Sequence, residues 1–242
     1  MIQFTHESSY WDSQDTICRR MNIQEQDQPN GNFIEILRHG RSLSVFAANI
    51  GNSGRMNDLF SVIDPIFGEI SPFLQDKRHV LLIRDNKDES IDGIYPVGHC
   101  YSRNEVQIAV PQWPADDAQL KDAGAHELHH MARRQTVGYG KTLGEVITTE
   151  GLAVLYGVEK SGWIPPWATV SVPDDMYKKA LNEWENASYS HKDWFFQGAY
   201  GRWIGYSIGF RLAQLFFREG FDLKKSLYCT ADDLRKSATM PL

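Results

Sequence analysis

The sequence has few cysteines, no basic stripe and no long apolar run, and each absence excludes a class of protein. Its three cysteines, Cys18, Cys100 and Cys229, lie far apart and form no CxxC pair. A disulfide framework is therefore not expected, and a reducing compartment is favoured. The net charge is −6, and the lysines and arginines do not gather along the chain. Such a chain is poorly suited to binding nucleic acid.

Segments that would direct the chain to a membrane are also missing. The most apolar one, Trp203 to Phe217, is interrupted by Arg211 and Gln214, so we expect no membrane span. The N-terminal residues MIQFTHESSYWDSQD lack the basic region and apolar run of a signal peptide. Together with the cysteine pattern, this favours a cytoplasmic protein whose partners are small molecules, peptides or proteins.

The overall composition is typical of a globular protein. The chain has 242 residues, of which 42% are hydrophobic and 23% charged, enough to bury a substantial core. We expect a single domain over residues 1–242. It would consist of a loosely ordered N-terminal extension (1–32), a sheet-containing lobe (33–115) and a helical lobe (116–242) that carries the functional site.

The first half of the chain contains the strand signals. A near-helical apolar spacing predicts a helix over 57–74, despite Pro65. Val80 to Ile83 is a short apolar run, which predicts a buried strand over 79–84, and Glu105 to Val110 alternates as a second strand. Two strands joined by a long loop favour a small, mostly antiparallel sheet. The spacing in 33–43 is irregular and assigns no element.

The second half is predicted to be helical, with helices over 117–135, 142–157, 174–185 and about 200–218. Thr142 followed by Glu145 is the pattern of a capping box at the start of the second helix. Strands followed by helices are typical of an α+β fold.

One segment carries a chemical motif, Ala125-His126-Glu127-Leu128-His129-His130, which contains His-Glu-x-x-His. On a helix, residues i and i+4 lie on one face, so His126 and His130 can direct their imidazoles at one ion. Glu127 would lie beside that ion without binding it, where it can take a proton from metal-bound water. His129 points elsewhere on the helix, and we expect it to make a structural hydrogen bond.

A catalytic zinc site needs a third protein ligand, and Glu150 is the candidate. It lies twenty residues after His130, on the next predicted helix, which a short turn would fold back against the first. Gly151 follows directly and would let the two helices approach closely. Glu145 is the alternative carboxylate.

These motifs are similar to those of known metallopeptidases. HELHH followed by TTEGLA resembles the gluzincins, in which HExxH supplies two histidines and a downstream helix supplies a glutamate. More narrowly, the chain resembles the bacterial predicted zinc-dependent proteases of YjaZ type, over about residues 78 to 217. The resemblance implies Zn²⁺ as cofactor and a zincin-like fold, a small sheet over an active-site helix with a helical C-terminal half. It also implies that the strand before that helix, 105–110, binds the substrate backbone.

The function that this implies is hydrolysis of peptide bonds by metal-activated water, with Glu127 as the general base. The tetrahedral oxyanion needs a donor opposite the base. Tyr206 is favoured because the resemblance places a Gly-Tyr pair there, and Tyr200 and His191 are further candidates. Many gluzincins place an aspartate four residues after the glutamate ligand, where this chain has Val154. Asp122, Glu145 or a backbone carbonyl must then orient the metal-binding histidine.

Three alternatives stay open at this level. Cys100, in Gly98-His99-Cys100, is a possible third ligand, as in the peptide deformylases, which would make the protein a zinc amide hydrolase. A non-catalytic zinc-containing module that binds peptides or unfolded chains would have the same ligands. The third alternative is that the histidines hold no metal.

Overall fold

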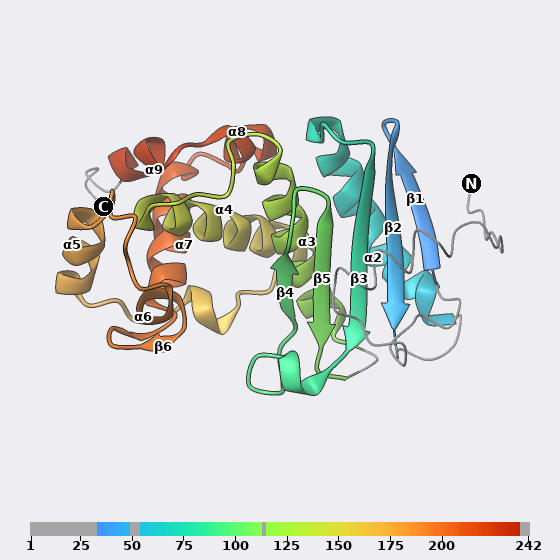
Figure 1. Cartoon of the computed structure of the whole chain (residues 1–242), viewed down its shortest axis with the longest axis horizontal. Coiled ribbons are helices and arrows are strands. Elements are labelled where there is room, and N and C mark those ends of the chain that lie inside the picture. The colour runs from blue at the N-terminus through green and yellow to red at the C-terminus, as the bar shows by residue number, and fades with distance from the viewer. Residues whose placement is uncertain (1–32, 49–53, 113–114, 238–242) are drawn as a thin grey trace.

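The computed structural model describes residues 33–48, 54–112 and 115–237. A mixed sheet forms one side of the molecule and a bundle of helices the other (Figure 1), so the fold is α+β, as predicted. The predicted N-terminal extension, 1–32, lies outside the described residues. Among the described helices, none is long and apolar enough to cross a membrane.

One sheet contains five strands, in the order β1-β2-β3-β5-β4. Their bounds are β1 (Phe33–Arg38), β2 (Arg41–Ala48), β3 (Arg78–Asp85), β4 (Val97–Cys100) and β5 (Glu105–Val110). β2 and β5 both pair with β3 in parallel, whereas β1 and β4 are antiparallel to their neighbours. The prediction of a mostly antiparallel sheet was therefore wrong. The loop between the two predicted strands contains β4, which returns the chain so that β3 and β5 run in the same direction.

The segment 33–43, which the sequence left unassigned, is the start of a β-hairpin. Its turn falls at His39 and Gly40, whose φ angles are 49° and 72°. Two successive positive φ angles are typical of the tight turns that suit the twist of a hairpin. Because the turn lies in the middle of the segment, the window 33–43 contains parts of two strands and shows no single alternation.

The helices follow the predicted order, with three short ones added. Their bounds are α2 (Gly54–Ile70), α3 (Asp117–Arg134), α4 (Leu143–Ser161), α5 (Asp174–Asn182), α6 (His191–Phe195), α7 (Ile204–Phe216), α8 (Leu223–Tyr228) and α9 (Ala231–Ser237). A small hairpin, β6 (Gln197–Gly198) and β7 (Gly201–Arg202), lies before α7. The predicted capping box is present, since Thr142 and Glu145 bond to each other's backbone at the start of α4.

Two hydrophobic cores meet at α3 and α4. The first joins the sheet to α2 and α3 through residues such as Ile63, Leu81 and Leu128. The second surrounds α4 and α7 and includes Trp184 and Trp194, both fully buried. α3 packs against α4 and against strands β4 and β5, so its buried face is held between the sheet and the helical half of the molecule.

A pair of glycines sets the distance between α4 and α7. A Cβ atom on Gly151 would lie 2.2 Å from the backbone of Gly209, and one on Gly209 would lie 2.3 Å from the carbonyl oxygen of Ile147. Gly151 was predicted to let α4 approach the motif helix, which is wrong, because it faces α7 instead. The close packing nevertheless holds the helix that carries Glu150.

Candidate metal centre

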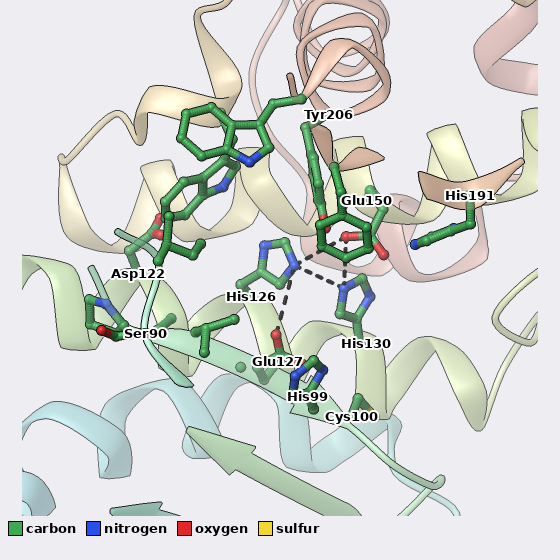
Figure 2. Close-up of a pocket in the computed structure, with 18 of the residues that line it drawn as sticks. Ser90, His99, Cys100, Asp122, His126, Glu127, His130, Glu150, His191 and Tyr206 are labelled. Atoms are coloured by element: carbon green, nitrogen blue, oxygen red, sulfur yellow. Dashed lines mark hydrogen bonds and ion pairs between the residues drawn. The ribbon is translucent and has the colours of Figure 1, made fainter. Parts of the chain in front are cut away.

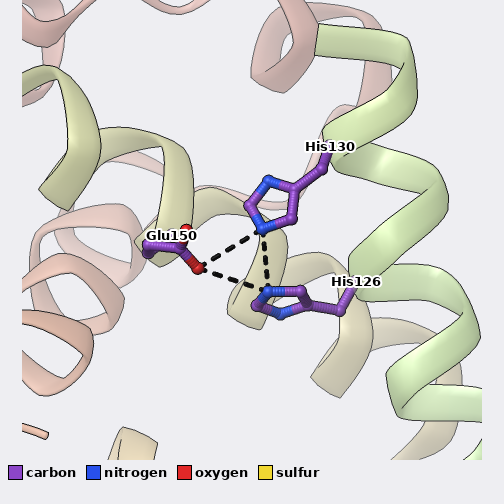
Figure 3. A group of neighbouring side chains, drawn as sticks. All are labelled: His126, His130 and Glu150. Atoms are coloured by element: carbon purple, nitrogen blue, oxygen red, sulfur yellow. Dashed lines mark hydrogen bonds and ion pairs between the residues drawn. The ribbon is translucent and has the colours of Figure 1, made fainter. Parts of the chain in front are cut away.

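Helix α3 places its two histidines on one face. The helix begins at a capped end, where the side chain of Asp116 accepts a hydrogen bond from the backbone N–H of Gln119 at 3.0 Å. One helical turn separates His126 from His130, and their rings pack edge to face with centroids 4.5 Å apart. Figure 3 shows both imidazoles directed at Glu150, which comes from α4. Three side chains from two adjacent helices thus converge on one point.

The distances within this cluster fit a zinc ion. The Nε2 atoms of His126 and His130 are 2.9 Å apart, and each lies 3.3 Å from Oε2 of Glu150. Tetrahedral ligands at about 2.0–2.1 Å from zinc lie about 3.3 Å from one another. Among the histidine, cysteine and acidic side chains of the described residues, these three form a group in which all ligand atoms lie within 4.8 Å of one another. The donor set, two imidazoles and a carboxylate, is one that zinc accepts.

Burial and charge act together on the protons of the cluster. Burial opposes the charged form of His126, but the hydrogen bond to Glu150 and nearby carboxylates outweigh it and raise its pKa to about 9. Burial lowers the pKa of His130. Burial also disfavours ionised Glu150, yet the two imidazoles hold its pKa well below the ordinary value. The carboxylate is thus ionised beside a shared proton, and a bound cation would replace that proton.

Glu127 lies beside the cluster and against the edge of the sheet. Its Oε1 atom is 4.0 Å from Nε2 of His126, and its Oε2 atom is buried with no hydrogen-bond partner among the described residues. A Cβ atom on Gly98, in β4, would lie 2.2 Å from Cγ of Glu127, so the carboxylate rests directly on the β4 backbone. Burial raises the pKa of Glu127 to about 7, against the attraction of His126. A carboxylate with that pKa is suited to proton transfer near neutral pH.

Tyr139, which the sequence analysis did not single out, holds the other oxygen of Glu150. Its phenol donates a hydrogen bond to Oε1 of Glu150, and its ring packs against His130 at 5.3 Å between centroids. Thr149 anchors the same loop by donating to the carbonyl oxygen of Tyr139 at 2.7 Å. Burial and the charge of Glu150 raise the pKa of Tyr139, so the phenol stays protonated. Its sequence context is Gly138-Tyr139-Gly140, between the two predicted helices, a pattern that indicates a turn but not the direction of the side chain.

The two acidic candidates for orienting a metal-binding histidine can now be compared. Glu145 is occupied at the start of α4, where its carboxylate accepts from the backbone N–H groups of Lys141 and Thr142. Asp122 lies one turn before His126, is 2% exposed and lines the same cavity. Burial raises the pKa of Asp122 to about 7, against the attraction of His126. Of the two carboxylates, Asp122 is thus the one whose charge acts on His126.

The cluster opens into a cavity of about 630 Å³ between the sheet and the helices. Tyr206 and His191, two of the predicted oxyanion donors, line it, and Figure 2 shows Tyr206 pointing into the pocket that contains Glu150 and Glu127. Tyr200 does not belong to this lining. Its ring packs on Trp194 at 4.9 Å and beneath Lys179, so the structure does not bring Tyr200 to the site.

Two further residues of the motif region have other roles. Cys100 lines the cavity, but it is not part of the ligand cluster, and its thiol donates to the carbonyl oxygen of Ser102 at 3.1 Å. Burial raises the pKa of Cys100 to about 12, which disfavours the thiolate that binds metals. His129 is fully buried, and its Nε2 atom is 3.1 Å from Oγ of Ser226. The expected structural hydrogen bond of His129 is therefore present.

The fold and the site define an α+β protein with a buried two-histidine, one-glutamate centre, a class that includes metal-dependent hydrolases. A comparison with family models agrees with that class. Residues 73–236 match the model of the family described as "Predicted Zn-dependent protease (DUF2268)", and the chain belongs to this family. No curated protein and no solved structure gave a significant match.

Proposed function

We propose that this protein is a zinc metallopeptidase of gluzincin type with a zincin-like fold, in which His126, His130 and Glu150 hold the metal. The observation that carries the proposal is the convergence of three ligand atoms, 2.9–3.3 Å apart, with a second buried carboxylate, that of Glu127, beside them. The cavity at the cluster is large enough for part of a peptide. Membership of a family of predicted Zn-dependent proteases supports the same conclusion.

The residues around the centre have complementary roles. Bound zinc would supply Lewis acidity to a water molecule and to the carbonyl of the scissile bond. Glu127 accepts a proton from the attacking water and delivers it to the leaving amine. Tyr206, on the helical side of the cavity, is our candidate for the donor to the developing oxyanion. Tyr139 keeps the Glu150 carboxylate in one orientation.

The substrate backbone is proposed to lie along β4. The family resemblance implies that the strand 105–110 has this role, but β5 is paired on both sides, with β3 and with β4, so it offers no edge. Within the described sheet, β4 ends the strand order and pairs with β5 alone. Its residues Val97 to Cys100 line the cavity. An extended peptide could add to this edge as a further strand, with its carbonyl groups beside the centre.

The cellular location that we propose, the cytoplasm, rests on the composition of the chain. Its scattered cysteines and acidic charge support a cytoplasmic peptidase that acts on peptides or proteins and binds no nucleic acid.

The test of the metal site is zinc stoichiometry by elemental analysis after dialysis against a weak chelator. We expect about one zinc per chain in the wild type and much less in Glu150→Ala. The control is Glu159→Ala, which removes an exposed glutamate from the same helix and should keep its zinc. Equal zinc in wild type and Glu150→Ala would remove Glu150 from the site, and no zinc in any of the three would contradict the proposal.

A further inference from the structure

The cavity at the candidate metal centre has an aromatic wall that the reaction does not use. Trp167, Trp203 and Phe196 line it, and all three belong to the helical half of the molecule. Trp203 packs edge to face against Trp167 at 6.0 Å between centroids. Trp167 is in turn supported from behind by Trp163 and Tyr95, at 5.7 Å and 6.1 Å. Two layers of rings therefore fix the positions of the two tryptophans, whereas the ring of Phe196 packs against His191 at 5.5 Å between centroids.

Trp203 is held in a conformation that a bulky residue rarely adopts. Its φ and ψ angles are 64° and 18°, in the left-handed region. Among the described non-glycine residues, the other two with positive φ are His39 and Asp92, and Asp92 lines the same cavity. Backbone strain of this kind persists where surrounding contacts enforce it, and it gathers at functional sites.

The contacts that enforce it connect the two halves of the molecule. The guanidinium of Arg202 lies 3.8 Å from the ring centroid of Trp203. It also donates two hydrogen bonds to the carboxylate of Asp92, at 2.9 Å and 2.6 Å. Asp92 lies between β3 and β4, so this pair bridges the sheet side and the helical side of the cavity. One face of the Trp203 ring is covered by the guanidinium, and the residue stays partly exposed.

The charges on this side of the cavity cancel. Asp92 neutralises the guanidinium of Arg202 by accepting two hydrogen bonds from it. What remains for a ligand is a rigid apolar surface, opposite the polar residues of the metal centre. Pockets of this composition bind apolar groups, and their few polar groups orient the ligand.

We infer that Trp203, Trp167 and Phe196 form a subsite for a large apolar side chain of the substrate, next to the scissile bond. The inference rests on the proposed peptidase function and specifies its substrate class: peptides with a residue such as phenylalanine or leucine beside the cut. The wall contributes shape and apolar area, and the metal centre acts on the backbone. The subsite therefore selects substrates without taking part in the chemistry.

The experiment measures peptide binding rather than hydrolysis. The protein carries Glu127→Gln, so that peptides are retained, and two peptides differ only in phenylalanine or alanine at one central position. Titration calorimetry gives both affinities. We expect the phenylalanine peptide to bind about 10- to 100-fold more tightly, as burial of one large apolar side chain predicts. Trp203→Ala should remove most of this preference and leave the alanine peptide nearly unchanged.

Two further variants test whether the preference depends on the residues that line the cavity. Phe196→Ala truncates a half-exposed residue of the same wall, so folding should survive, and it should reduce the preference partly. Trp163→Phe keeps an aromatic ring against Trp167 at a position that does not line the cavity, and it should keep the preference. Zinc content and thermal unfolding of each variant report on the fold.

The outcomes separate this inference from the proposed function. If the wild type hydrolyses neither peptide but the Trp203-dependent preference persists, the subsite stands and the proposed reaction is wrong. If both peptides are hydrolysed or bound equally, or if Trp203→Ala and Phe196→Ala weaken both peptides alike, the subsite assignment is wrong.

Discussion

At the residue scale, the site depends on how firmly one carboxylate is held. Tyr139 donates to one oxygen of Glu150 while the other oxygen faces His126 and His130. Groups that orient a metal ligand typically change metal affinity by about 10- to 100-fold when they are removed. We therefore predict that Tyr139→Phe weakens zinc binding by about that factor, measured by competition with a chromophoric chelator.

Tyr206→Phe is the matched control for this prediction. It removes a phenol hydroxyl from the same cavity, but Tyr206 makes no hydrogen bond to Glu150 within the described structure. Its zinc affinity should stay close to that of the wild type, while peptide hydrolysis falls. If Tyr139→Phe and Tyr206→Phe bind zinc equally well, Tyr139 does not position the ligand.

Asp122 gives a prediction about pH. Burial raises its pKa from 3.8 to about 7, so the folded protein takes up a proton that the unfolded chain releases. The stability that protonated Asp122 contributes is full below about pH 4 and is lost as the pH rises through 7. Asp122→Asn is neutral at every pH. We expect the free energy of unfolding of Asp122→Asn, relative to that of the wild type, to rise by on the order of 2–4 kcal/mol between pH 4 and pH 8.

The measurement is the free energy of unfolding in urea, on metal-free protein, at pH 4 and pH 8. Asp117→Asn, on the exposed first turn of the same helix, is the control and should show no such change. A constant difference between Asp122→Asn and wild type across this range would show that Asp122 is not a buried acid with a raised pKa.

The residues that the sequence predicted and those that it missed differ in a physical way. His126, His130 and Glu150 could be proposed because helical spacing brings i and i+4 together and because one helix pair returns the chain. Tyr139 could not, because the direction of its side chain depends on a loop whose glycines, Gly138 and Gly140, have φ angles of 92° and 115°. No local periodicity describes such a loop. Tyr200 was proposed as a tyrosine of the same aromatic-rich stretch as Tyr206, but it lies in the turn between β6 and β7, and its ring packs on Trp194.

At the scale of elements, β4 and α3 fit together without space for one methyl group. Gly98 lies so close to Glu127 that a Cβ atom would overlap its carboxylate, at 2.2–2.5 Å. Because Glu127 is flexible, Gly98→Ala should displace the proposed base while the fold persists. A displacement of about 1 Å can reduce a rate 100-fold, so we predict a loss of kcat of about that size.

The comparison is with Gly68→Ala, in α2, where an added Cβ atom would make only ordinary contacts at 3.9 Å. Both variants should keep their zinc and unfold near the wild-type temperature, and only Gly98→Ala should lose activity. Full activity in Gly98→Ala would mean that the position of Glu127 against β4 does not matter for the reaction.

The strands illustrate why element type is easier to predict than pairing. The sequence identified β3 and β5 from their apolar pattern, and the observed bounds, Arg78–Asp85 and Glu105–Val110, are close to the predicted ones. β4, in contrast, contains Gly98 and His99 and shows no apolar alternation. Without β4, the direction of β5 and the identity of the free edge were both predicted wrongly.

At the scale of the whole molecule, the candidate site lies where two cores meet. The sheet side contributes β4, and the helical side contributes α4 and the aromatic wall, while α3 belongs to the boundary between them. The order of strands and helices predicted this α+β class, because each half builds its core largely from consecutive elements. The shape of the cavity was beyond prediction, since it depends on contacts such as Asp92 with Arg202, which are 110 residues apart.

The central claim is that this cavity hydrolyses peptides through a metal centre with Glu127 as the base. It is tested most directly by comparing wild type and Glu127→Gln for zinc content and for hydrolysis of a peptide library read by mass spectrometry. We predict about one zinc per chain in both proteins, cleavage by the wild type, and a loss of cleavage of at least 100-fold in the variant. Equal cleavage by both proteins, or none by a wild type that holds its zinc, would contradict the claim.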